Sequence, residues 1–204
     1  MGKVRLEAFS DGVFAIAITL LVLNLAVPEF GRLGEGGLAG ALAREWPAFA
    51  AFGVSFAVIG IIWVNHHAIF HAIRGVDRTL LFLNLLLLAT VVFMPYPTAL
   101  MSHAFEAGRD QKLATAIYGA TSTAMGMGFN VLWLYLDRHR DLLEEPFRTS
   151  GTLSVLWRSG MGTILYVATI GLAFINPYVC LVVFAALAVF YVFDLGAISL
   201  RGRA

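Results

Sequence analysis

The chain has 204 residues, of which 59% are hydrophobic and 13% are charged, and its mean hydropathy is +0.81. Soluble domains carry about 25% charged residues, so this composition excludes an ordinary soluble domain and indicates a polytopic membrane protein. The formal net charge of +1 gives no reason to expect a nucleic acid as partner, and the single cysteine, Cys180, excludes an intrachain disulfide and a cysteine metal cluster.

Six apolar runs follow one another along the chain, and each is long enough to cross a bilayer, which takes roughly 20 apolar residues. We therefore predict an all-α fold in a single domain, residues 1–204, with spans at about 9–27, 46–70, 79–101, 113–136, 156–175 and 178–198. The third span contains Pro95-Tyr96-Pro97 near one end, where a kink or an early helix end is expected.

The distribution of Lys and Arg between the two membrane sides predicts the orientation. Cytoplasmic loops carry an excess of these residues. Four of them fall on one side, namely Arg32, Arg44, Arg109 and Lys112. Ten fall on the side of the termini, namely Lys3, Arg5, Arg74, Arg78, Arg138, Arg140, Arg148, Arg158, Arg201 and Arg203. We expect both termini to be cytoplasmic.

The first span combines a polar start with an aliphatic stripe. A carboxylate such as Asp11 at the lip of an apolar helix is costly, so it is usually retained for a specific partner or an ion path. At about 100° per residue, one narrow stripe holds Ile16, Leu20, Leu23 and Val27, with Thr19 on its flank. Ser10 and Asp11 project to the other side. The hypothesis is that the stripe lines a pore while this polar pair anchors the helix in its own protomer. Contact of the stripe with lipid or other helices is the alternative.

A second polar concentration lies at the cytoplasmic end of the second span and contains Trp63, Asn65, His66, His67 and His71. It sits at the membrane level of Asp11, to which Asn65, His66 or His67 could supply donors. Histidine also permits proton relay. His67 and His71 are one helical turn apart, as two metal ligands would be, but no third ligand is evident. We interpret the group as a hydrogen-bonded structural cluster and expect no metal.

Two features of the later spans favour helix packing. Asn84 is an amide within the third span and is expected to form a hydrogen bond to another helix. Small residues recur every fourth position in the fourth span, with Gly119 and Thr123 alongside, namely Ala116, Ala120, Ala124 and Gly128. Small residues on one face let helix backbones approach closely.

The pattern Arg5-x-x-x-Phe9-Ser10-Asp11 resembles the start of the first helix in the transmembrane protein 175 family of endosomal and lysosomal potassium channels. The length, the six spans and the Trp63…His66-His67 stretch resemble its bacterial single-repeat members. The resemblance implies a potassium-permeable cation channel in the bacterial cell membrane. It also implies a homotetramer whose four first helices line a central pore.

The same resemblance implies roles for individual residues. Ile16, Leu20 and Leu23 would form an aliphatic constriction, and Thr19 would present a hydroxyl to the ion path. The motif itself would hold the pore helix in place. Monovalent cations, the bilayer and further copies of the chain are then the expected partners. Potassium is the permeant species, and no cofactor is expected.

Other functions remain open from the residues. A proton- or cation-coupled secondary transporter could use Asp11 with His66 and His67 as a relay. A membrane metalloprotein could be built on the three histidines, and a non-conducting scaffold is a further alternative. We predict no enzyme, because no nucleophile arrangement or phosphate-binding loop is recognisable. A backbone-carbonyl filter of the Thr-Val-Gly-Tyr-Gly kind is also missing from the sequence.

Overall fold

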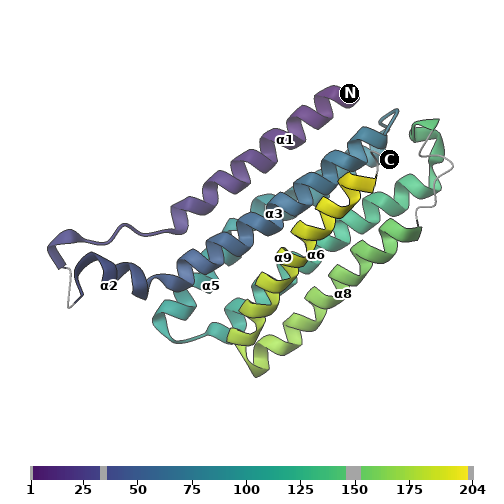
Figure 1. Ribbon diagram of the computed structural model, residues 1–204. Coiled ribbons are helices and arrows are strands. Elements are labelled where there is room, and N and C mark those ends of the chain that lie inside the picture. The colour runs from purple at the N-terminus through teal and green to yellow at the C-terminus, as the bar shows by residue number, and fades with distance from the viewer. Residues whose placement is uncertain (1, 33–35, 146–152, 202–204) are drawn as a thin grey trace.

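The computed structural model describes residues 2–32, 36–145 and 153–201, with side chains described between 160 and 193 in the last range, and it is helical almost throughout (Figure 1). The α-helices are α1 (Lys3–Leu20), α2 (Gly37–Arg44), α3 (Trp46–Ala72), α4 (Arg78–Phe93), α5 (Pro95–Ala107), α6 (Gln111–Arg138), α8 (Leu153–Ile175) and α9 (Pro177–Arg201). Short 3-10 helices cover Leu21–Asn24, Phe30–Arg32 and Arg140–Leu142. The prediction of an all-α fold is confirmed.

Three helical stretches in the described part are long and apolar enough to cross a membrane: Lys3–Asn24, Trp46–Ala72 and Arg78–Ala107. Two shorter apolar stretches, Gly160–Ile175 and Pro177–Phe193, lie in α8 and α9. Helix α6 occupies the region of the fourth predicted span but is not apolar enough to join the first group. Six membrane crossings therefore stay a prediction.

The first predicted span ends earlier than expected. Helix α1 tightens into the 3-10 turn Leu21–Asn24, and Leu25 is already extended, with φ −91° and ψ 112°. The prediction of a helix to residue 27 was therefore wrong, and Val27 does not belong to the helical stripe. Pro28 disfavours helical backbone at Val27, and Asn24 Nδ2 donates to the carbonyl oxygen of Pro95 at 3.3 Å, which connects the end of this turn to the start of α5.

The third predicted span breaks at its prolines, as expected. Helix α4 ends at Phe93 and α5 begins at Pro95, because a proline lacks the N–H that an unbroken helix needs. Helix α5 then continues to Ala107, beyond the predicted end at 101. Gly108 follows with φ 67°, the left-handed conformation that commonly closes a helix.

A chain of buried hydroxyl groups supports α5 just after this break. Thr98 Oγ1 donates to the carbonyl oxygen of Met94 at 2.8 Å and lies 2.9 Å from Ser55 Oγ, which is 3.1 Å from Tyr118 Oη. Since Thr98 has given its proton to Met94, Ser55 must donate to Thr98 and Tyr118 to Ser55. All three side chains are at most 1% exposed. The chain thus ties α3, α5 and α6 together inside the bundle.

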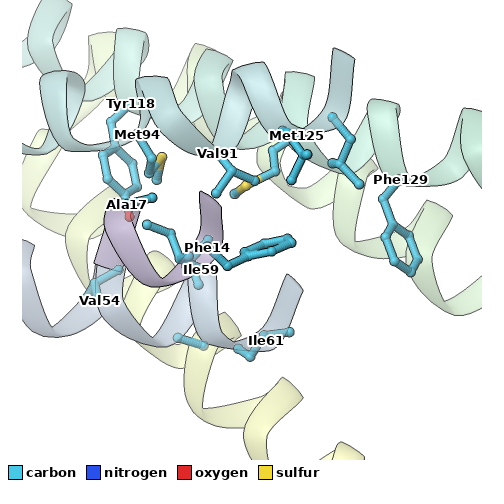
Figure 2. Close-up of a cluster of buried hydrophobic side chains, with 14 of the residues drawn as sticks. Phe14, Ala17, Val54, Ile59, Ile61, Val91, Met94, Tyr118, Met125 and Phe129 are labelled. Carbon is cyan, nitrogen blue, oxygen red and sulfur yellow. The ribbon is translucent and has the colours of Figure 1, made fainter. Parts of the chain in front are cut away.

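Helix α1 lies along one side of the bundle and contacts α3 and α4 (Figure 1). Phe14 and Ala17 of α1 reach the core, where Figure 2 shows them near Ile59 and Val91. Phe14 is 1% exposed and Ala17 is fully buried. Burial of a large apolar side chain contributes about 1.5–3 kcal/mol, so this contact fixes which side of α1 faces inward.

Glycines on α6 allow α8 and α4 to approach closely. A Cβ atom on Gly126 would lie 2.6 Å from Thr163 Oγ1, and one on Gly119 would lie 2.9 Å from Thr169 Oγ1. On the opposite neighbour, a Cβ on Gly128 would lie 3.4 Å from the Cα atom of Leu87. The packing role predicted for Gly119 and Gly128 is confirmed, and Gly126 adds a contact that the four-residue repeat did not include.

We predict that Gly126→Ala destabilises the fold by about 1–3 kcal/mol, the usual cost of overpacking a close contact. The matched control is Gly60→Ala in α3, because a Cβ there meets nothing within 4 Å. That control should be neutral or slightly stabilising, since alanine is the better helix former. Thermal unfolding in detergent measures both variants. Equal unfolding temperatures for the two variants would contradict the packing account.

Asp77 connects the start of α4 to α6. Its Oδ1 accepts a hydrogen bond from the backbone N–H of Leu80 at 2.8 Å, an N-cap, and its Oδ2 accepts one from the Tyr135 hydroxyl. Partial burial by itself disfavours the charged carboxylate. The hydrogen bonds from Tyr135 and Leu80 outweigh that effect and hold the pKa of Asp77 below its usual value.

The lowered pKa of Asp77 predicts a pH dependence of stability. An Asp whose pKa falls on folding stabilises the fold above its unfolded pKa of about 3.9, and that stabilisation is lost as pH falls through the folded pKa. The unfolding temperature of the wild type should therefore drop more steeply between pH 5 and pH 3 (about one unit either side of that value) than that of Asp77→Asn. Asparagine keeps the N-cap without the charge. Parallel curves for the two proteins would show that Asp77 does not carry the effect.

Candidate ion-conduction site

Helix α1, taken together with the 3-10 turn Leu21–Asn24 that continues it, has two distinct faces. The inward face consists of residues that are at most 2% exposed, namely Leu6, Ser10, Phe14, Ala17 and Leu21. The stripe residues lie away from it: Ile16 is 59%, Leu20 40% and Leu23 75% exposed. Thr19 is exposed as well, and its hydroxyl donates to the carbonyl oxygen of Ile16 at 2.9 Å. In the single chain, an apolar stripe on α1 is thus left uncovered.

A buried polar network holds the inward face of α1 to α4 and α3. Ser10 Oγ donates to the carbonyl oxygen of Leu6 at 2.9 Å and accepts from Asn84 Nδ2 at 3.0 Å. Asn84 Oδ1 lies 2.8 Å from His66 Nε2. The side chains of Ser10, Asn84 and His66 are at most 1% exposed. The cross-helix hydrogen bond predicted for Asn84 is confirmed and is in fact two bonds, to two helices.

The hydrogen bond from Ser10 to Leu6 determines which of the other atoms in this network donate and which accept. Ser10 has given its proton to Leu6, so Asn84 must donate its amide to Ser10 and turn its oxygen toward His66. Nε2 of His66 therefore carries a hydrogen and donates. Nδ1 of His66 is buried and has no hydrogen-bond partner among the described groups. The imidazole stacks on Phe70, with ring centroids 4.3 Å apart, and lies 5.2 Å from the Phe14 ring.

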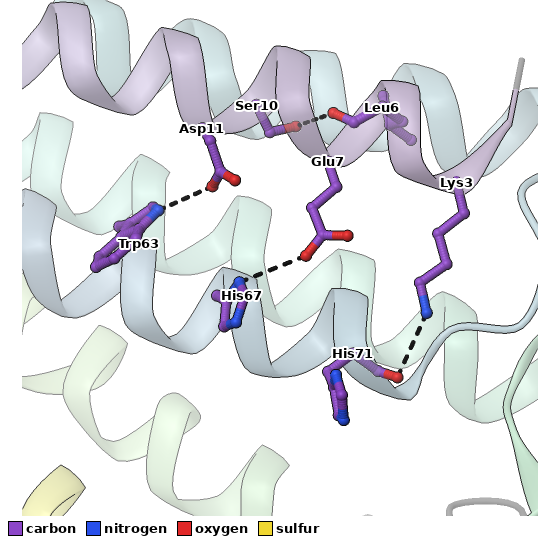
Figure 3. Close-up of polar contacts among 8 residues, drawn as sticks. All are labelled: Lys3, Leu6, Glu7, Ser10, Asp11, Trp63, His67 and His71. Carbon is purple, nitrogen blue, oxygen red and sulfur yellow. Dashed lines mark hydrogen bonds and ion pairs between the residues drawn. The ribbon is translucent and has the colours of Figure 1, made fainter.

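A ladder of polar pairs runs along the open edge between α1 and α3 (Figure 3). Three residues spaced by four on α1 meet three spaced by four on the antiparallel α3. The pairs are Asp11 Oδ1 with Trp63 Nε1 at 2.9 Å, Glu7 Oε1 with His67 Nδ1 at 3.4 Å, and Lys3 Nζ with the carbonyl oxygen of His71 at 3.5 Å. The ladder and the buried network together fix the rotation of α1 about its own axis.

The structure corrects two expectations about this cluster. The donor to Asp11 is the indole of Trp63, not Asn65, His66 or His67. Asn65 lies two residues beyond Trp63, about 200° around the helix, and lines a cavity between α3, α6, α8 and α9 instead. The motif residues Arg5 and Phe9 are both exposed on the chain, Phe9 to 48%.

Sequence reasoning missed two rungs of the ladder, those of Lys3 and Glu7. A signal was available, because Lys3, Glu7 and Asp11 repeat every fourth residue, as do Trp63, His67 and His71. Matching periods of four mark faces that antiparallel helices can bring together. Within the described residues, no group of three His, Cys, Asp or Glu side chains is placed to hold a metal ion.

Comparison with known proteins places this geometry in a family. The family model of the endosomal/lysosomal potassium channel TMEM175 matches residues 5–95, which include most of α1 and all of α3 and α4, with the buried network of Ser10, Asn84 and His66. A potassium channel of Streptomyces collinus is 43% identical over 190 residues, which covers 93% of this chain and 91% of that protein. The chain belongs to the TMEM175 family. It is therefore a membrane protein of a potassium channel family and not an enzyme.

Other members of the TMEM175 family extend the likeness. The crystal structure of a lysosomal potassium-selective channel TMEM175 homolog from Chamaesiphon minutus superposes with a TM-score of 0.82 at 36% identity, over 94% of this chain and 97% of that one. The human endosomal/lysosomal proton channel TMEM175 is 42% identical over 101 residues, 47% of this chain but 20% of the human protein.

We predict that Asn84→Leu destabilises the protein by about 1–3 kcal/mol, because the isosteric side chain leaves the buried groups of Ser10 and His66 without their partner. Phe82→Leu, two residues away and 60% exposed in the wild type, is the control and should change stability little. Denaturant or thermal unfolding in detergent measures the difference. If both leucine variants unfold alike, the network does not hold α1.

Proposed function

We propose that this chain is the subunit of a homotetrameric, potassium-permeable channel in the bacterial cell membrane, with both termini cytoplasmic. Four copies of α1 surround a central pore. The single observation that carries the proposal is the uncovered stripe of α1, on a helix whose other side is held by the core and by polar bonds. The potassium channel relatives that match nearly the whole chain support the same function.

The stripe suits a hydrophobic constriction. Four Ile16 side chains around an axis form a dry ring, which an ion crosses only by shedding its water or by widening the ring, so the ring gates by dewetting. Leu20 and Leu23 continue the apolar neck. The Thr19 hydroxyl donates its proton to the Ile16 carbonyl, which leaves the lone pairs of its oxygen available to a passing cation.

The motif residues act from the opposite side of α1. Ser10 and Asp11 accept hydrogen bonds from Asn84 and Trp63 of the same chain. These bonds leave the carboxylate of Asp11 turned toward α3 and away from the proposed pore axis. In this account Ser10 and Asp11 position the pore helix and do not themselves contact the ion.

The transporter alternative finds no support in the hydrogen bonding. Its relay needs Asp11 joined to His66 or His67. Asp11 bonds to Trp63, His66 to Asn84, and His67 pairs with Glu7. Among the described groups, no hydrogen bond or ion pair connects Asp11 with either histidine.

Electrophysiology of the purified protein tests the proposal. In planar bilayers with potassium chloride on one side and sodium chloride on the other, we expect unitary current steps and a reversal potential that favours potassium. Silence in the bilayer, together with saturable flux driven by a pH gradient in liposomes, would overturn the channel in favour of a coupled transporter.

We predict that Ile16→Asn increases the unitary current or the open probability severalfold, because amide side chains hydrate the ring and lower the dewetting barrier. Val22→Asn is the matched control. Val22 is 51% exposed, comparable to Ile16, but lies six residues further on, about 240° around a regular helix, so its substitution should leave the current unchanged. Single-channel recording measures both variants. An unchanged current in Ile16→Asn would exclude Ile16 as the constriction.

A further inference from the structure

A second feature lies inside the protomer, away from α1. A cavity of about 80 Å³ opens between α3, α6, α8 and α9. Most of its wall is apolar and includes Val58, Ile61, Met125, Phe129 and Ala188. None of the proposed pore residues lines it, so this inference does not rest on the proposed conduction path.

One polar group in the cavity wall has no partner. Ser122 of α6 is 2% exposed, and its hydroxyl makes no hydrogen bond to any described group. A buried hydroxyl without a partner destabilises the fold, because it has lost its hydrogen bonds to water and gained none in the protein. Thr163, across the cavity on α8, already accepts a hydrogen bond from Asn130 Nδ2 at 2.9 Å. The Ser122 hydroxyl is therefore a fully buried hydrogen-bonding position of the cavity wall that no described group fills.

Water is a poor match for such a space. A buried water needs room for about one solvent probe, on the order of 10–15 Å³, and two to four polar partners. The cavity is several times larger than that, and its wall is mainly aliphatic and aromatic, with Asn65, Thr163, Tyr166 and Tyr191 as its other polar residues. An apolar body in the cavity contacts that wall, and a single hydroxyl on the same molecule satisfies Ser122.

We propose that this cavity is a binding site for a small uncharged molecule with an apolar body and one hydroxyl group, of the short-chain alcohol class. The hydroxyl bonds to Ser122 Oγ, and the carbon body packs against Met125, Phe129 and Ile61. The site lies between α8, α9 and α3, and α3 also carries Trp63 and His67, which contact α1.

Two isosteric bromine-labelled probes test the site in crystals of the full chain. 2-Bromoethanol and 1-bromopropane differ only by a hydroxyl in place of a methyl group, and the anomalous signal of bromine reports position and occupancy. At equal concentration, 2-bromoethanol should occupy the cavity severalfold more than 1-bromopropane, with its oxygen within hydrogen-bond distance of Ser122 Oγ. Equal occupancy of the two probes, or a cavity that holds only water, would overturn the proposal.

Two variants sharpen the test. Ser122→Ala should lower the occupancy of 2-bromoethanol severalfold and leave 1-bromopropane unchanged, because the variant removes the hydroxyl and keeps the space. Ala188→Ile should exclude both probes by filling the cavity. If 2-bromoethanol binds Ser122→Ala as it binds the wild type, the hydroxyl is not the recognition element and the proposal fails. The comparison of the two probes in the wild type stands even if a variant does not fold.

Discussion

The rotational position of α1 about its own axis is the constraint on which the rest of the structure depends. A polar group buried in an apolar surrounding must be paired or it costs several kcal/mol. Ser10, Asn84 and the Nε2 atom of His66 are joined by a buried chain of hydrogen bonds, and Phe14 and Ala17 pack in the same core. Rotating α1 would break these bonds and expose the aromatic side chain. Because the Ser10 side of α1 must face the core, the stripe with Ile16, Leu20 and Leu23 must face away from it.

Regular helix geometry was sufficient to predict which side of the first helix carries its polar residues. A regular turn of 100° per residue placed Ser10 and Asp11 off the Ile16 stripe, and an amide in an apolar span required a partner, which Asn84 has. The donor to Asp11 could not be chosen from the sequence, because Trp63, Asn65, His66 and His67 all lay at one membrane level. Their order around α3 decides the matter: Trp63 faces α1, and Asn65 faces the interior of the bundle.

Features that depend on contacts between distant segments escaped prediction. Asn24, the last residue of the 3-10 turn that follows α1, bonds to the carbonyl oxygen of Pro95, 71 positions away. The Ser55, Thr98 and Tyr118 hydroxyl chain joins three helices whose register no local pattern reveals. Small-residue spacing did indicate close packing of α6, yet the tightest approach, at Gly126, lay outside the four-residue repeat. Sequence periodicity predicts which residues share a face of a helix. Which neighbouring helix that face contacts depends on the tertiary structure.

We propose that the uncovered stripe of α1 faces a permeation path, and cysteine accessibility tests this orientation most directly. Leu23 and Val22 are neighbours on the chain, 75% and 51% exposed, and the native Cys180 is buried and gives little background. A charged thiol reagent added from the side opposite the termini should block the current of Leu23→Cys and spare that of Val22→Cys. Equal block of both variants, or block of Val22→Cys alone, would contradict the claim.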